Sequence, residues 1–105
     1  MKPIRLNGLP QDMREALRET RRARGWSQEA FGRKVDLPQA HVSGIEAGKI
    51  VPRFDTLLDL VRALDFDLMM VPRSLVPAVQ ALIRDQQQSE GGEEQSLYAD
   101  VVDDA

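Results

Sequence analysis

A chain of 105 residues, 42% of them hydrophobic, is long enough for one small domain with a tail. It contains no cysteine, which excludes a disulfide framework, a thiolate metal site and a cysteine nucleophile, and which is compatible with a reducing cytosol. No apolar run approaches the length of a membrane span, and the first residues hold no signal-peptide core. We therefore expect a soluble, cytoplasmic protein with no membrane association.

The net charge of −3 conceals a strong segregation of charge along the chain. Residues 1–84 hold all 14 Lys and Arg against 10 Asp and Glu, a balance of +4, whereas residues 85–105 hold 7 acidic residues and no basic one. Phosphate groups respond to the local potential and not to the total charge of a chain. The acidic total therefore does not exclude a nucleic-acid partner for the first 84 residues.

Residues 1–10 read as an N-terminal arm. Ile4, Leu6 and Leu9 stand among Pro, Asn and Gly, which predicts an extended segment whose apolar residues pack on the domain; a short strand is the alternative. The first helix follows over residues 11–24, with its apolar residues inward and arginines outward, and glycine 25 ends it. We interpret these arginines as a solvated helix face, with phosphate contact as the alternative.

Two short helices separated by a tight turn are predicted next. Ser27 can cap a helix over Gln28–Val35 by accepting a hydrogen bond from a free backbone N–H. A proline at position 38 breaks the run, because it disfavours helical backbone at the residue before it and is tolerated only in a first turn. The second helix is therefore expected over Pro38–Ala47, with Gly48 as its stop.

The outward face of this second helix carries only small and amide side chains, namely Gln39, Ala40, Ser43 and Gly44. Small side chains allow a helix backbone to approach another surface closely, and a glutamine can form paired hydrogen bonds to the edge of a base, adenine by preference. The alternative is a weakly solvated helix in an ordinary all-α domain.

These residues carry a family resemblance. SQEAF at 27–31, Val35, VSGIEAGK at 42–49 and Pro52 together resemble the helix-turn-helix signature of the phage-repressor (Xre-type) family. The resemblance covers roughly residues 13–64. It implies an all-α bundle of four or five helices in which the second helix of the motif enters the major groove of DNA.

The resemblance also implies roles for particular side chains. An arginine at position 21 and a glutamate at position 46 would form a structural ion pair between the first and third helices. Gln28 lies in the first turn of its helix, where free N–H groups and the helix dipole favour a phosphate. His41 is either a DNA contact or a partly solvated spectator; one histidine without cysteine cannot form a zinc site. The expected base contacts are Pro38, Gln39, Ala40 and Ser43. The expected phosphate contacts are Gln28, His41, Lys49 and Arg53.

Behind the motif, residues 54–64 form a predicted amphipathic helix. Its inward stripe is expected to contain Phe54, Leu57, Leu58, Val61 and Leu64. Leu60 falls outside that stripe, so we expect it to face a partner subunit.

Residues 65–71 change to a period of two and read as one short strand. A lone strand cannot satisfy its backbone groups, so pairing with the same strand of a second copy, in a two-fold homodimer, is the economical solution. Such a dimer would place two recognition helices about one DNA turn apart, on a palindromic operator. The expected dimer strand comprises Phe66, Asp67, Leu68, Met69 and Met70.

A helix-turn-helix domain followed directly by such a strand resembles the antitoxins of HipBA-type modules, and this implies a partner toxin with a serine/threonine kinase fold. The chain departs from that pattern because it continues past the strand. Residues 72–86 predict one more helix, which packs on its own dimer or docks another protein. Residues 87–105 are acidic and expected to be disordered in isolation, or to fold onto a partner.

The leading hypothesis is thus a sequence-specific dimeric repressor that controls its own operon and binds a kinase-fold toxin. The alternatives are a free-standing phage-type regulator and a DNA-binding adaptor in a three-part complex whose kinase is neutralised by another protein. An enzyme is not expected, since no catalytic constellation, phosphate loop, metal cluster, cofactor site or small-molecule substrate site can be read from the chain.

Overall fold

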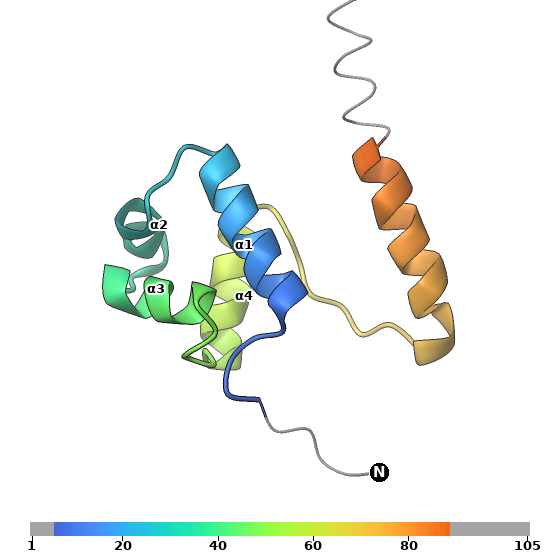
Figure 1. Ribbon diagram of the computed structural model, residues 1–105, viewed down its shortest axis with the longest axis horizontal. Coiled ribbons are helices and arrows are strands. Elements are labelled where there is room, and N and C mark those ends of the chain that lie inside the picture. Colours follow the sequence, from blue (N-terminus) through green and yellow to red (C-terminus); the bar gives the residue numbers. More distant parts are fainter. Residues whose placement is uncertain (1–5, 89–105) are drawn as a thin grey trace, which may run out of the picture. The chain divides into compact units, whose positions relative to one another are not determined.

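The computed structural model describes residues 6–88 and divides into two compact units, Met1–Leu68 and Met69–Ala105 (Figure 1). The first unit holds four helices, and the second holds a single turn of 3-10 helix, Arg73–Leu75, followed by a helix that covers residues 76–88. These helices confirm the expected all-α bundle, whereas the strand expected over residues 65–71 is not among the elements of residues 6–88. The four helices of the first unit are α1 (Gln11–Ala23), α2 (Gln28–Val35), α3 (Gln39–Glu46) and α4 (Phe54–Ala63).

Local chemistry explains where the short helices begin and end. The Oγ of Ser27 accepts a hydrogen bond of 3.0 Å from the backbone N–H of Ala30, which caps α2 as predicted. Asp36, in the left-handed region at φ 60°, ends α2, and Gly48 at φ 77° follows α3. Pro38 lies just before α3 and not inside it, because its backbone is extended at φ −63° and ψ 151°.

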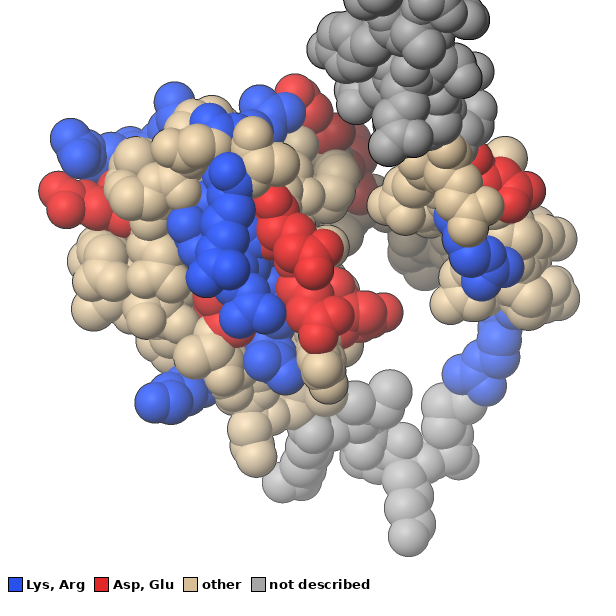
Figure 2. Space-filling view, turned by 45° about the horizontal axis from the view of Figure 1, so that its top comes forward, with Lys and Arg blue, Asp and Glu red and all other residues tan. Residues whose placement is uncertain are grey.

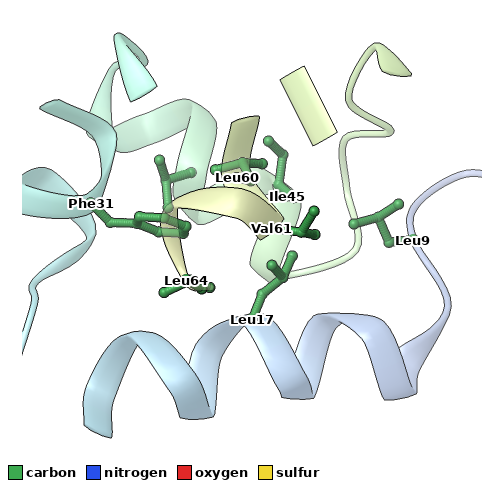
Figure 3. Packing of buried hydrophobic residues seen from close by; sticks show 8 residues of the cluster. Leu9, Leu17, Phe31, Ile45, Leu60, Val61 and Leu64 are labelled. Carbon is green, nitrogen blue, oxygen red and sulfur yellow. The ribbon is translucent and has the colours of Figure 1, made fainter. Parts of the chain in front are cut away.

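The core gathers side chains from all four helices and from the arm (Figure 3). Leu17 of α1, Phe31 of α2 and Ile45 of α3 point toward one another and toward α4, and Leu9 packs at the arm end of the cluster. The predicted packing of the arm is therefore confirmed for Leu9, whereas Leu6 is 51% exposed. The buried cluster consists of Leu9, Leu17, Phe31, Val42, Ile45, Leu60, Val61 and Leu64.

The buried side of α4 differs from the predicted stripe in two places. Leu60 is only 1% exposed, so the expectation that it faces a partner subunit is wrong. Phe54 is 67% exposed, so its predicted place in the core is also wrong. Periodicity fixes which direction an apolar residue points but not how far the covering elements extend, and the first turn of α4 lies at the edge of the core.

A glycine in each helix of the motif lies against a neighbouring segment, Gly32 against backbone and Gly44 against a side chain. A Cβ on Gly32 would lie 2.3 Å from the carbonyl oxygen of Leu37, so α2 and the turn touch at this point. A Cβ on Gly44 would lie 2.4 Å from Cδ1 of Ile50. The loop after α3 therefore covers Gly44, which removes it from the predicted outward face.

The segment after α4, residues 66–72, adopts no helix or strand within this single chain. Leu68 is half-buried against the core cluster, whereas Met69 and Met70 are 82% and 99% exposed. A backbone hydrogen bond from Leu68, and then the guanidinium of Arg62, lower the pKa of Asp67 below its ordinary 3.8. Because pairing needs a second chain, the dimer strand stays a prediction.

Two further properties of the described residues bear on function. None of the helices in this part of the chain is long and apolar enough to cross a membrane. No group of three or more His, Cys, Asp or Glu residues within 6–88 is placed to hold a metal ion.

Replacing Leu60 tests the observed side of α4 against the predicted one. Leu60→Ala should lower the free energy of unfolding by about 2–5 kcal/mol, because it leaves a cavity in the packed core. Phe54→Ala is the matched control and should change stability by no more than about 0.5 kcal/mol, since its side chain is mostly in solvent. Urea denaturation of both variants measures the difference; a larger destabilisation by Phe54→Ala would contradict the packing.

Candidate nucleic-acid interface

The turn between α2 and α3 leaves the first half of α3 open to solvent. The two helices lie side by side in the first unit (Figure 1), and the inner side chains of α3, Val42 and Ile45, are each 1% exposed. On the opposite side Gln39 and Ala40 are exposed, and Ser43 is half-buried. Pro38, directly before the helix, is exposed as well. The four predicted base contacts therefore lie in the first half of α3 and at the residue before it, and three of them, Pro38, Gln39 and Ala40, are open to solvent.

The predicted phosphate contacts lie in the elements that flank this face. Lys49 and Arg53 are exposed in the loop after α3, while Gln28 and His41 are half-buried in the first turns of α2 and α3. Arg53 forms an ion pair of 3.3 Å with Asp55, and both side chains are largely in solvent. Such a pair is weak, so it does not prevent Arg53 from binding an external phosphate.

Four side chains from three helices form a hydrogen-bonded chain that ends at the exposed face. The guanidinium of Arg21 donates to both carboxylate oxygens of Glu46, over 2.7 Å from Nε and 3.0 Å from Nη2. Nε2 of Gln28 also donates to Glu46, over 3.1 Å. Oε1 of Gln28 then accepts from Nε2 of Gln39, over 2.8 Å. The exposed glutamine of α3 is thus connected through Gln28 to the ion pair.

The acceptor-only character of the ionised Glu46 carboxylate fixes the direction of every bond in this chain. Gln28 must present its NH₂ group to Glu46, so its carbonyl oxygen turns toward α3. Gln39 must in turn present its own NH₂ group to Gln28. Its carbonyl oxygen and second N–H are left for an external partner, and this acceptor–donor pair is complementary to the N6 and N7 edge of adenine.

The ion pair itself is almost completely buried. The side chains of Arg21 and Glu46 are 7% and 4% exposed. A third donor of the arginine, Nη1, binds the backbone oxygen of Trp26 over 2.8 Å. No buried side-chain nitrogen or oxygen within the described residues lacks a hydrogen-bond partner. The Arg21–Glu46 pair that the resemblance implied is therefore present and fully satisfied.

Phe54, which was expected in the core, is a candidate for this surface only by its exposure and its place in the sequence. It follows Arg53 directly and is 67% exposed. Its position as the first residue of α4, next to a predicted phosphate contact, was the signal available in the sequence.

Positive charge is concentrated on part of the first unit. Figure 2 shows Lys and Arg side chains gathered in a band across one face, with acidic side chains along one side of it. Arg14, Arg18 and Arg22 recur every fourth residue on α1, which places them on one helix face. Arg18 and Arg22 are exposed, as expected of a solvated helix face, whereas Arg14 is half-buried and its Nε donates to the backbone oxygen of Leu9 over 2.9 Å.

Two short helices at a tight turn, the second presenting small and amide side chains, define a helix-turn-helix domain. The family described as "Helix-turn-helix domain" matches residues 12–73. The chain belongs to this family.

One curated protein is similar to this chain in sequence, and two solved structures are similar to it in fold. An "Uncharacterized HTH-type transcriptional regulator y4dL" from Sinorhizobium fredii (strain NBRC 101917 / NGR234) is 35% identical over 69 residues, which are 66% of this chain and 35% of that protein. This chain therefore spans about a third of its relative's length. Two solved structures, titled "MDT Protein" and "Structure of HipA-HipB-O2-O3 complex", each share its fold with a TM-score of 0.54 at 19% identity, covering 70% of this chain and 99% of theirs.

Removing one partner of the ion pair should be strongly destabilising. Glu46→Ala leaves Arg21 buried without its counter-charge and should lower the free energy of unfolding by about 3–5 kcal/mol in urea denaturation. The double variant Arg21→Met with Glu46→Leu removes both charges and should recover most of that stability. A Glu46→Ala protein that unfolds at the same urea concentration as the wild type would contradict the account.

Proposed function

We propose that this protein is a sequence-specific, dimeric transcriptional repressor that reads adenine-containing half-sites of a palindromic operator. The observation that carries the proposal is Gln39. It is exposed, stands in the first turn of α3 and is oriented by its hydrogen bond to Gln28. An amide with one acceptor and one donor free fits the major-groove edge of adenine. Ala40 and Ser43 are small enough to let the helix backbone come close to the base pairs.

Phosphate contacts would fix the register of the helix on the duplex. Lys49 and Arg53 are exposed beyond the end of α3, and His41 lies at its beginning. Gln28 retains one N–H that neither Glu46 nor Gln39 uses, so it can still bind a phosphate while it orients Gln39. These groups bracket the base-reading face on both sides.

The proposed homodimer uses the segment Phe66–Met70. Phe66 is 42% exposed, and together with Leu68 and Met13 it lines an apolar pocket of about 130 Å³. Met69 and Met70 stand almost fully in solvent. Pairing with the same segment of a second copy would satisfy the backbone groups and cover apolar surface that a monomer leaves wet.

An antitoxin role, with a kinase-fold toxin as partner, is the finer form of this proposal. It is supported by the likeness of the fold to a chain of the HipA–HipB complex. The helix over residues 76–88 adds an apolar surface, since Leu82 and Ile83 are 68% and 52% exposed within the second unit. The same surface would equally suit a DNA-binding adaptor in a three-part complex. A gene for a kinase-fold protein next to the gene of this protein would favour the antitoxin and the adaptor over a free-standing regulator.

Base and phosphate contacts should respond differently to substitution. Gln39→Ala should relax the choice at one base position, at a cost of about 1–3 kcal/mol on the preferred sequence and little on others. Lys49→Ala should weaken binding to all sequences alike and reduce the slope of log K against log salt by about 0.9, the value for one phosphate that is no longer neutralised. Fluorescence anisotropy on duplexes selected by the wild-type protein from a randomised pool measures both effects. Equal weakening on every duplex for Gln39→Ala would contradict a base-reading role.

The dimer strand can be tested through its backbone. Met69→Pro deletes a backbone N–H and should raise the dimer dissociation constant at least tenfold, because proline cannot donate to a strand ladder. Met69→Ala, which keeps the N–H, is the control and should stay close to wild type. Sedimentation equilibrium compares them, and two variants with the same association constant would argue against strand pairing.

A further inference from the structure

The first unit holds an apolar pocket of about 130 Å³ between α1, α4 and the segment that follows α4. A volume of this size is below the roughly 300 Å³ of small-molecule sites, and it suits a single apolar side chain. Phe66 is 42% exposed and Leu68 is half-buried, so part of the apolar wall is in contact with water. The apolar residues that line the pocket include Met13, Ala16, Val61, Phe66 and Leu68.

The backbone N–H groups of the segment after α4 alternate between bonded and free. The N–H of Phe66 donates to the backbone oxygen of Val61 over 2.8 Å, and that of Leu68 donates to the carboxylate of Asp67 over 2.8 Å. In the part of the chain that the structure describes, the N–H groups of Asp67 and Met69 reach no acceptor. An antiparallel strand donates to its neighbour from every second residue. The segment therefore offers its odd-numbered N–H groups to a second strand.

This alternation limits how two copies of the segment can pair. Alignment about Leu68 sets Asp67 against Met69 of the second copy, and these two residues then exchange the hydrogen bonds. Phe66 lies opposite Met70 of the second copy, in a non-hydrogen-bonded pair whose Cα atoms are about 4.5 Å apart. Alignment about Asp67 would instead set two like charges directly against each other, which is destabilising.

The alternation of side chains decides where Met70 of the second copy points. Successive side chains of a strand lie on opposite faces, so Met70 shares the face of Phe66 and Leu68. Both of these residues line the pocket. A methionine set opposite Phe66 on that face is therefore directed at the pocket of the chain with which it pairs.

We propose that each pocket receives the Met70 side chain of the second copy, so that the homodimer is closed by a reciprocal exchange of two methionines. Met70 is 99% exposed within its own chain. An unbranched thioether side chain adapts well to an irregular apolar gap, and a two-fold axis makes the exchange mutual. The inference rests on the proposed homodimer and goes beyond it, because it names the side chain that completes the interface and the alignment of the two segments.

Exchanging volume between Met70 and the pocket tests the insertion. Met70→Ala should raise the dimer dissociation constant roughly tenfold or more, since each dimer then loses two buried methionines. Ala16→Met fills the pocket from α1 and should raise the constant by a similar factor. The double variant should dimerise more tightly than either single variant, because the methionine on α1 then occupies the space that Met70 vacates. Sedimentation equilibrium compares them, with Met69→Ala as the control expected near wild type.

The absence of cysteine allows the alignment to be tested by cross-linking. A mixture of Phe66→Cys and Met70→Cys chains should form a disulfide between the two chains on oxidation, because opposite residues of a non-hydrogen-bonded pair lie within its reach. A mixture of Phe66→Cys and Met69→Cys chains should not, since residue 69 points to the other face. Mass spectrometry of the digested dimer identifies the linked positions.

The outcomes separate this inference from the homodimer on which it rests. A wild-type chain that stays monomeric across the concentration range would overturn the homodimer and the exchange together. A wild-type dimer that Met70→Ala leaves as tight as Met69→Ala does, or a preferred link between positions 66 and 69, would overturn the exchange alone and leave the pocket to another partner. Purely additive effects of Met70→Ala and Ala16→Met would also contradict it, since the two residues would then act at separate places.

Discussion

The buried pair of Arg21 and Glu46 is the constraint on which the interface depends. It joins α1 to the end of α3 in a place where neither charge reaches solvent, so the helices cannot shift without leaving a charge unpaired. Because the glutamate can only accept hydrogen bonds, it also sets the orientation of Gln28 and, through it, of Gln39. The buried ion pair thereby determines which hydrogen-bonding groups of Gln39 remain free for an external partner.

Local rules in the sequence were enough for much of the fold. The start of α2 follows from the cap at Ser27, and the end of α3 follows from Gly48. The sequence alone did not determine which side of α4 is buried, because its apolar residues fit more than one stripe at spacings of three and four. Residues 57, 60, 61 and 64 also satisfy the helical spacing, and only the neighbouring helices decide that Leu60 is buried and Phe54 is not.

The candidate site, too, could be predicted from the sequence only in part. The uncharged face of α3 could be predicted from the sequence. That Gly44 does not belong to it follows only from the structure, in which Ile50 folds back over the helix. The pair of Arg21 and Glu46, 25 residues apart, came from family resemblance and not from any local pattern. The bond between Gln28 and Gln39 has no sequence signal, because it depends on the angle between two helices.

The central claim is that Gln28 orients Gln39 to donate to N7 of adenine, and base substitution in the DNA tests it most directly. Replacing the adenine read by Gln39 with 7-deazaadenine removes the N7 acceptor and leaves N6. We expect this change to weaken binding of the wild-type protein about five- to tenfold and to have almost no further effect on Gln28→Ala. An equal penalty in the two proteins would contradict the account, since Gln39 would then be oriented without Gln28.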